Sequence, residues 1–403
     1  MYTDSYLDKT TDKASALQAE LIGKDTNATV SASGNKLSVK YRGKDKVLDV
    51  SAGTVSDSIT VAKAKKDGIV FDDNTSITDT YGNTFIVPKG FKLASDSAEN
   101  VTEGIVIEDA TYTNTKGSEF VWIPVSKDST DKNKVKGAKN TTILLRRYVF
   151  DSNGNVDATL SKSDPQDQLN TYYTEGLKDS TIANAHAKDI EDFISKTNAA
   201  GGFYIGRYEV RIEGYTGNVA TSNSNNETSW TGYTGGKLVE KPGAQVFNYI
   251  TQNKASELSR KMYEKENDGT TAITKFESDL INSYAWDTAT LFLQEYDNRT
   301  NEVKDNPNYK AKYSNQIRLS TGMEDTGTNN LSVEANKDKI CNVYDMAGNC
   351  WEWSTETSSA YGYPCVPRGG TGNNSSNYTS IRLGGTTTLS FGYGSFRPVL
   401  YIK

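Results

Sequence analysis

The stretch Val343-Tyr-Asp-Met-Ala-Gly-Asn-Cys-Trp-Glu-Trp353 decides the fold of this chain. Its central Ala-Gly-Asn favours a turn, because glycine adopts the positive φ angles that β-branched residues resist. Trp351 and Trp353 follow two residues apart, so on a strand they share one face and can enter one core, whereas Glu352 faces the other way. The stretch therefore predicts a tight turn that leads into a strand packed on a core.

Two later segments extend this pattern toward the C-terminus. Arg368-Gly-Gly370 begins fifteen residues after Trp353, and the chain ends Gly394-Ser-Phe-Arg-Pro-Val-Leu-Tyr-Ile-Lys403. A strand this apolar is normally protected from solvent and from other chains. We therefore expect the last strand to be docked inside a sheet.

The composition of the chain excludes several classes of function. Its 403 residues include 45 Lys and Arg against 51 Asp and Glu, for a formal net charge of −6. With no basic excess, binding to nucleic acid through phosphate neutralisation is not expected. The longest apolar run, residues 120–125, is far shorter than the roughly 20 residues that span a bilayer. The single histidine, His186, excludes a His-rich zinc site.

Two small units are expected before the main domain. Residues 1–24 are polar with a thin apolar face, which predicts an N-terminal helix or linker that needs a packing partner. Residues 25–83 alternate polar and apolar positions between turn signals, which predicts a small antiparallel β module. Its expected strands cover residues 28–32, 36–41, 47–50 and 58–61. The Lys-rich residues 63–66 are expected to form a solvated edge or turn.

Residues 84–403 form the main domain in this interpretation. Its fold class is α+β, because few segments have the helical period and many are short strands joined by polar connections. Residues 214–236 are expected to form a long exposed loop. Helices are expected at residues 189–199, at about 255–265 and from near Ser278 onward, and strands at residues 84–91, 104–108, 119–125 and 202–210.

Five segments in this order resemble the landmarks of formylglycine-generating-enzyme (sulfatase-modifying factor) domains. The resemblance covers residues 84–403 and implies a C-type-lectin-like fold with small sheets, long loops and two flanking helices. The landmarks are Phe120-Val-Trp-Ile-Pro, Phe203-Tyr-Ile-Gly-Arg-Tyr-Glu-Val, Asn342-Val-Tyr-Asp-Met-Ala-Gly-Asn-Cys-Trp-Glu-Trp, Arg368-Gly-Gly and Gly394-Ser-Phe-Arg.

The chemistry of that enzyme family is not expected here. The family holds copper with a pair of cysteine thiolates a few residues beyond Arg-Gly-Gly, and the equivalent residues 371–380 contain no cysteine. Asn and Thr cannot replace the soft thiolates that bind Cu(I). Cys350 and Cys365 lie before the Arg-Gly-Gly landmark, so we expect a non-enzymatic protein without a catalytic cofactor. A structural calcium ion stays an open alternative, and so does a glycosidase-type carboxylate pair of Glu352 and Glu356.

The C-terminal loops, about residues 361–395, have the composition of a binding surface. From residue 371 to 395, 20 of 25 residues are Ser, Thr, Asn, Gly or Tyr, and Arg382 is the only charged one. Such segments combine adaptable hydrogen-bonding groups with rigid aromatic rings. The segment resembles the variable region of diversity-generating-retroelement target proteins, which share this fold and vary at adenines of Asn-type codons. Ordinary loops of a lectin-like scaffold have a similar composition and remain an alternative.

The expected function is therefore the binding or display of a ligand. The partner would be an unknown protein or glycan at a cell surface, and the location extracellular or cell-surface, with an anchoring segment absent from this chain. A phage or prophage virion is the alternative location. A catalytically altered oxidase and a structural pilus or phage tail subunit are the alternative functions. The expected ligand contacts are Tyr361, Tyr363, Asn373, Asn374, Asn377, Tyr378, Phe391, Tyr393 and Trp230.

Overall fold

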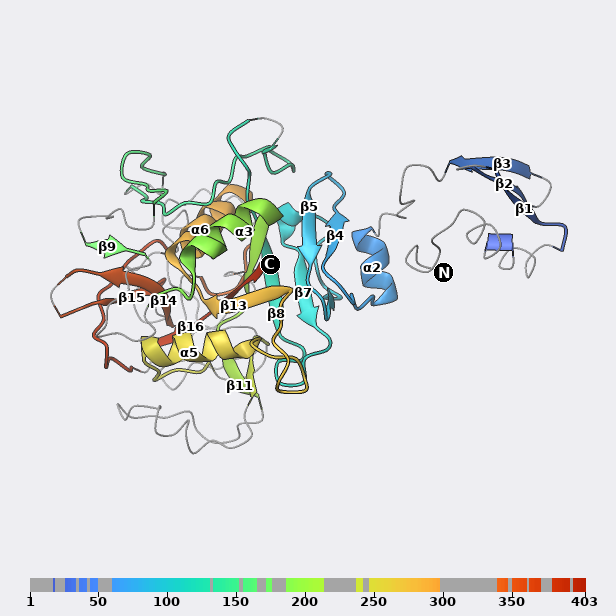
Figure 1. Ribbon diagram of the computed structural model, residues 1–403. Helices are drawn as coiled ribbons and strands as arrows, with labels where there is room; N and C mark the ends of the chain where they lie inside the picture. The colour runs from blue at the N-terminus through green and yellow to red at the C-terminus, as the bar shows by residue number, and fades with distance from the viewer. Residues whose placement is uncertain are drawn as a thin grey trace, which may run out of the picture. The chain divides into compact units, whose positions relative to one another are not determined.

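The structure is a computed structural model (Figure 1) that describes most of the chain from residue 60 onward and parts of the N-terminal region. The predicted helix at residues 1–24 lies outside the described residues except for Leu17 and Gln18, which are helical, and the predicted loop 214–236 lies wholly outside them. The described residues are 17–18, 26–33, 36–41, 44–49, 60–130, 133–151, 155–164, 172–175, 186–213, 237–241, 246–297, 339–346, 350–360, 362–370, 379–391 and 394–403.

The chain divides into two compact units, Met1–Ile59 and Thr60–Lys403. The first contains an antiparallel sheet of β1 (Thr29–Ser33), β2 (Lys36–Tyr41) and β3 (Lys44–Asp49). The division falls at residue 60 rather than at residue 84, where the sequence places the start of the main domain.

Residues 60–83 belong to the larger unit because they pack into it. Of the strand expected at residues 58–61, residues 58 and 59 lie outside the described residues, and Thr60 forms a single β-bridge with Thr78. Helix α2 (Val61–Asp67) begins at Val61, and its first turn is capped when the Thr60 hydroxyl accepts from Lys63 N. Val61 and Ala64 are buried, and α2 packs against β6 (Phe91–Leu93). The Lys-rich residues 63–66 are therefore helical. The hairpin of β4 (Thr75–Thr78) and β5 (Thr84–Val87) follows.

An antiparallel sheet lies at the centre of the larger unit. Its strands are β6, β7 (Val106–Asp109), β8 (Glu119–Pro124), β10 (Gly202–Gly206), β13 (Phe276–Leu280) and β17 (Pro398–Ile402). Within the described ranges the order is β13-β17-β10-β8-β7-β6, so the C-terminal strand lies between two others. This confirms the prediction that the last apolar strand is docked inside a sheet.

Three longer helices also pack against the sheets. α3 (Ile190–Ala200) packs on β10 and β17, and it begins and ends as predicted, with Asp189 as its N-cap and Gly201 left-handed at its end. α5 (Gln252–Met262) starts earlier than expected because the Thr251 side chain caps it by accepting from Lys254 N. Figure 1 shows α3 in green, α5 in yellow and α6 (Ser283–Tyr296) in orange.

The prediction that the third helix starts near Ser278 is wrong. Ser278 lies in strand β13, which pairs with β17 along its whole length, and α6 (Ser283–Tyr296) begins after it. The Asn282 side chain caps α6 by accepting from Ala285 N. Residues 276–280 form a strand although the sequence that follows has a helical period. Pairing with the apolar strand β17 satisfies their backbone N–H and C=O groups.

A second sheet carries the landmark tryptophans. It consists of β9 (Tyr173–Thr174), β14 (Trp351–Ser358), β15 (Cys365–Arg368) and β16 (Gly394–Phe396), with β14 paired to the other three. As predicted, Trp351 and Trp353 are both buried. The remaining elements are the 3-10 helix η2 (Val101–Glu103) and the paired strands β11 (Arg211–Glu213) and β12 (Lys237–Val239). The fold class of the described residues is α+β, with mostly antiparallel sheets and few helices.

Candidate functional site

The structure describes two of the predicted ligand contacts, Tyr363 and Phe391. The others lie outside the described residues: Tyr361, Asn373, Asn374, Asn377, Tyr378, Tyr393 and Trp230. Tyr363 is 52% exposed and lies between β14 and β15, in a turn where its N–H donates to the Ala360 carbonyl. The structure therefore places Tyr363 where a ligand can reach it.

Phe391, the other described residue of this set, packs against the core. It is partly buried, and its ring meets Trp353 edge-on with the ring centroids 5.8 Å apart. A Cβ built at Gly394 would lie 2.7 Å from this ring, so the chain packs tightly around it. Phe391 thus contributes to the core beneath the loops, as a support of the surface.

Two exposed residues that the sequence did not single out lie near Tyr363. Tyr172, 51% exposed, precedes β9, and its carbonyl accepts from Ser359 N just beyond β14. Leu383, 38% exposed, adjoins Gly384, where a Cβ would lie 2.7 Å from Tyr363 Cβ. We call the surface formed by Tyr172, Tyr363 and Leu383 the β14 tip. The sequence signal for Tyr172 is only the Tyr172-Tyr173 pair in a polar stretch.

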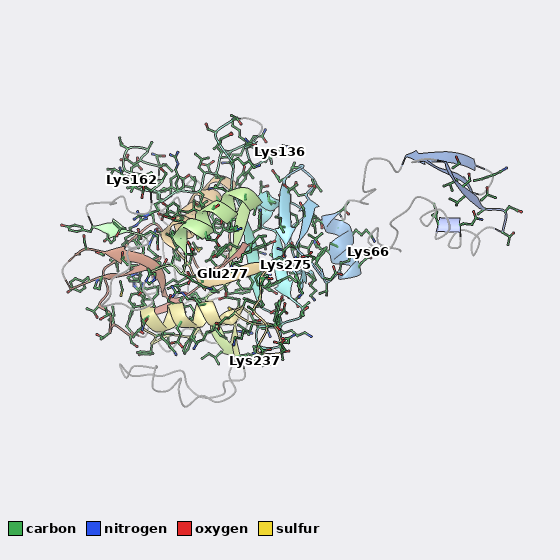
Figure 2. All side chains as sticks on the ribbon, viewed as in Figure 1. Lys66, Lys136, Lys162, Lys237, Lys275 and Glu277 are labelled. Atoms are coloured by element: carbon green, nitrogen blue, oxygen red, sulfur yellow. The ribbon has the colours of Figure 1, made fainter. Side chains whose placement is uncertain are left out.

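The C-terminal segment adds no exposed charge to the β14 tip. Between Glu356 and Arg397, the only charged residues are Arg368 and Arg382, and the side chains of both are buried. Exposed lysines occur on other elements of the unit, as Figure 2 shows for Lys66 of α2. The two arginines are buried because each pairs with the carboxylates of Glu356 in β14 and Asp287 in α6.

Arg382 fastens the C-terminal loop to the core. Its Nε lies 2.9 Å from both carboxylate oxygens of Glu356, and its terminal nitrogen pairs with Asp287 of α6. The Arg382 carbonyl also accepts from the Tyr173 hydroxyl at 3.2 Å. The one charge of residues 371–395 is therefore an anchor, which composition alone does not reveal.

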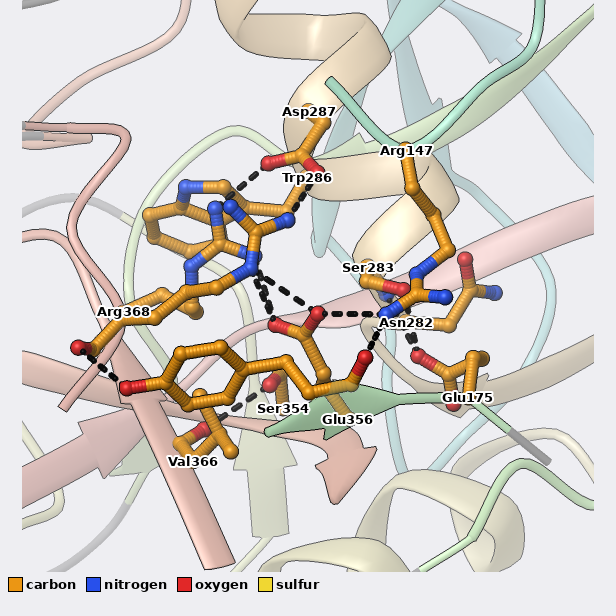
Figure 3. Close-up of polar contacts among 12 residues, drawn as sticks. Arg147, Glu175, Asn282, Ser283, Trp286, Asp287, Ser354, Glu356, Val366 and Arg368 are labelled. Carbon is orange, nitrogen blue, oxygen red and sulfur yellow. Dashed lines mark hydrogen bonds and ion pairs between the residues drawn. The ribbon is translucent and has the colours of Figure 1, made fainter. Parts of the chain in front are cut away.

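Arg368, in strand β15, also bonds to the C-terminal segment near Arg382. Its terminal nitrogens donate to Glu356 at 3.2 Å and to Asp287 at 2.5 Å, while its Nε donates to the Ile381 carbonyl at 2.9 Å. The guanidinium also lies over the Trp286 ring, 5.5 Å from its centre. Arg368 thus joins β15, α6 and the loop in one contact set (Figure 3).

A third arginine, Arg147, completes the cluster. It donates to Glu356 at 3.1 Å and to the Tyr173 carbonyl at 2.9 Å, which fixes β9 beside β14. Glu175 lies nearby, and its carboxylate accepts from the Ser283 N–H and hydroxyl and from Thr355 Oγ1. Burial raises the pKa of Glu175. We call Arg147, Glu175, Asp287, Glu356, Arg368 and Arg382 the anchoring cluster, and Figure 3 labels all of these residues except Arg382.

The anchoring cluster predicts a pH dependence of stability. Burial alone would raise the pKa of Glu356, but the charges of Arg382, Arg368 and Arg147 lower it to about 2 from 4.5. Since the folded-state pKa is the lower one, the stabilisation is complete above about pH 4.5 and is lost as pH falls toward 2. We expect wild type to lose more unfolding free energy between pH 5 and pH 3 than Glu356→Gln, measured by urea titration. Equal losses would contradict this role.

A second buried ion pair joins the landmarks. Arg397 donates to both oxygens of Glu352, at 2.8 and 3.0 Å, to the Gly206 carbonyl at 2.7 Å and to the Tyr344 carbonyl at 2.8 Å. The nearby carboxyl groups of Glu209 and Glu240 are buried, and burial raises the pKa of each.

The two carboxylates weighed as a glycosidase pair are thus both engaged inside the protein. Glu352 accepts from Arg397, whereas Glu356 accepts from Arg147, Arg368 and Arg382. Their hydrogen bonds hold strands and loops together. In this arrangement each carboxylate is a structural acceptor.

The three cysteines, Cys341, Cys350 and Cys365, are buried, and no disulfide bond joins any two of them. Cys365 packs with Trp353 and Phe396, whereas Cys350 packs with Val246 in a separate apolar cluster. Among the residues that the structure describes, no group of three or more His, Cys, Asp or Glu side chains is arranged to hold a metal ion.

None of the helices in the described part of the chain combines the length and the apolar character needed to cross a membrane. Comparisons of the chain with protein-family models, with curated proteins and with solved structures found no match.

Proposed function

We propose that this chain is a non-enzymatic protein that binds or displays a ligand through the β14 tip and the C-terminal residues 361–395. The proposal depends on one observation: the β14 tip exposes aromatic rings, whereas the charged residues of the C-terminal segment are buried in the anchoring cluster. The β14 tip presents the exposed rings of Tyr172 and Tyr363. The only two charged residues of 361–395, Arg368 and Arg382, are buried in the anchoring cluster.

This arrangement suits recognition of a partner. Interface centres are depleted in charge and enriched in aromatic residues, and Tyr supplies contact area at a low entropy cost. A loop held by several buried ion pairs has fewer conformations to lose on binding, which favours affinity. The anchoring cluster would therefore hold the loop backbone while its Ser, Thr, Asn and Tyr side chains meet the ligand.

We further propose that residues 84–403 have the C-type-lectin-like fold of formylglycine-generating-enzyme-type domains. Arg397 supports this, because it bonds to Gly206, Tyr344 and Glu352 and so joins three of the five landmark segments in one contact set. The variable proteins of diversity-generating retroelements are the type of protein proposed. Sequencing the 3′ end of the gene in one clonal lineage tests diversification, which would vary codons 371–395 and spare codons 342–353.

The proposed partner is a protein or glycan at a cell surface, and the proposed location is extracellular, on a cell or on a virion. A catalytically altered oxidase remains the alternative from another class, and copper uptake that depends on Cys350 and Cys365 would favour it. Filament formation by the purified chain would favour a structural pilus or tail subunit instead.

Alanine variants of the β14 tip test the binding proposal. We expect Tyr172→Ala and Tyr363→Ala each to weaken binding about tenfold, because truncating a central aromatic contact costs about 1–2 kcal/mol. The probes are an array of neutral and acidic glycans and an array of purified cell-surface proteins. Tyr81→Ala is the matched control, since Tyr81 is 45% exposed in the turn between β4 and β5. Equal binding by all three variants, or none by wild type, would contradict the proposal.

A further inference from the structure

The sheet of the first unit leaves two edges. Among its described strands the order is β1-β2-β3, so β1 and β3 each have one side without a paired strand. An edge strand presents unpaired backbone N–H and C=O groups, which form a template for another strand. Proteins usually protect such edges with charge, with proline or with a covering group.

The two edges are protected in different ways. Strand β3 reads Lys-Asp-Lys-Val-Leu-Asp, so four of its six residues are charged, whereas β1 reads Thr-Val-Ser-Ala-Ser and has no charge. Charged residues, lysine above all, discourage pairing along an edge. The charges in the sequence of β3 therefore disfavour its pairing with a further strand, whereas the sequence of β1 allows such pairing.

The side chain of Gln18 covers the β1 edge. Its Nε2 donates to the Ala28 carbonyl at 2.6 Å, and its Oε1 accepts from Val30 N–H. On an antiparallel strand the backbone groups of successive residues point to opposite sides, so those of Ala28 and Val30, two residues apart, point to the same side. Both bond to Gln18, which places that side away from β2. The Gln18 amide thus supplies one donor and one acceptor at the place where a neighbouring strand would supply them.

We propose that the outer edge of β1 is a docking site for β1 of a second copy of this chain, and that Gln18 closes it. An antiparallel pair centred on Val30 would bring Ala28 opposite Ala32 and Thr29 opposite Ser31. No charged residues lie opposite each other in this pairing. In a two-fold arrangement each copy contributes the same backbone groups of β1. The inference is independent of the ligand-binding function, because it concerns the separate N-terminal unit.

Removing the Gln18 amide tests this directly. In the 403-residue chain we expect Gln18→Ala to raise the association constant of a dimer about tenfold or more, because the two backbone groups that the Gln18 amide satisfied become available to a second copy. Sedimentation velocity over a concentration series measures this. The same association constant in wild type and Gln18→Ala would overturn the proposal.

Two further substitutions decide whether association runs through β1. Val30→Pro, added to Gln18→Ala, removes the outward N–H, and proline is tolerated on an edge strand where that N–H has no ladder partner. Thr29→Lys with Ser31→Lys leaves the backbone intact but sets like charges opposite each other in the proposed pair. Thr29 and Ser31 are exposed, so lysine fits at both. We expect both combinations to return association to the wild-type level, and association that persists in both would overturn the proposal.

Discussion

Replacing Arg368 with Met should lower the free energy of unfolding by about 3–5 kcal/mol. Arg368 and its partners Glu356 and Asp287 have no exposed side-chain surface, so no water can replace the lost guanidinium. Removing one member of a buried ion network leaves the opposite charges without compensation. Met keeps the length and apolar stem of the side chain, so the loss reports the charge and its hydrogen bonds more than a cavity.

The neighbourhood of Arg368 offers a matched control. Arg146 is exposed, and Arg146→Met should change the free energy of unfolding by no more than about 0.5 kcal/mol. Urea unfolding followed by circular dichroism measures both variants. A loss of less than about 1 kcal/mol in Arg368→Met would show that the anchoring cluster contributes little to stability, and the rigid-support argument for the β14 tip would fail with it.

Gly104→Ala is expected to be at least as damaging, at about 3 kcal/mol or more. Gly104 ends η2 with φ +94°, and a Cβ there would lie 1.9 Å from the Cys341 carbonyl oxygen. That oxygen belongs to backbone, so it cannot rotate away as a flexible side chain would. The Gly104 carbonyl also accepts from the Asn342 amide at 2.7 Å, so a shift would break a second contact.

A substitution at a second glycine distinguishes the steric clash at Gly104 from the cost of a positive φ angle. Gly269 has φ +71°, but a Cβ there would meet nothing within 4 Å. Gly269→Ala should therefore cost only the strain of a left-handed alanine, about 1–2 kcal/mol. If thermal unfolding gives the two variants the same loss, then the close approach of Gly104 to Cys341 is not a determinant of stability.

Local chemistry in the sequence is enough to predict some elements. Helix α3 has apolar residues at helical spacing, an Asp at its start and Gly201 at its end, and each signal acts within a few residues. The apolar C-terminal strand is predicted for a similar reason. The start of α6 is not, because Ser278 joins β13 through pairing with β17, which is more than 100 residues away in sequence.

The proposed binding surface also combines features that the sequence predicts with features that it does not. Its composition predicts a Tyr-bearing segment with little charge, and Tyr363 is exposed as that prediction requires. Phe391 instead packs on Trp353, and Tyr172 reaches the surface from a separate part of the chain. Neither outcome follows from spacing along the sequence, because each depends on which strands become neighbours.

The sequence by itself determined the α+β fold class, the near absence of charge in residues 371–395 and the strand that carries Trp351 and Trp353. These properties depend on composition and on short-range periodicity, which any sequence carries without reference to distant residues. The turn predicted at residues 347–349 lies outside the described residues. Only the tertiary structure decided that Arg368 and Arg382 are anchors, because their partners Glu356 and Asp287 come from a different strand and a helix. A buried charge is stable only beside its counter-charge, and the counter-charge is supplied by folding.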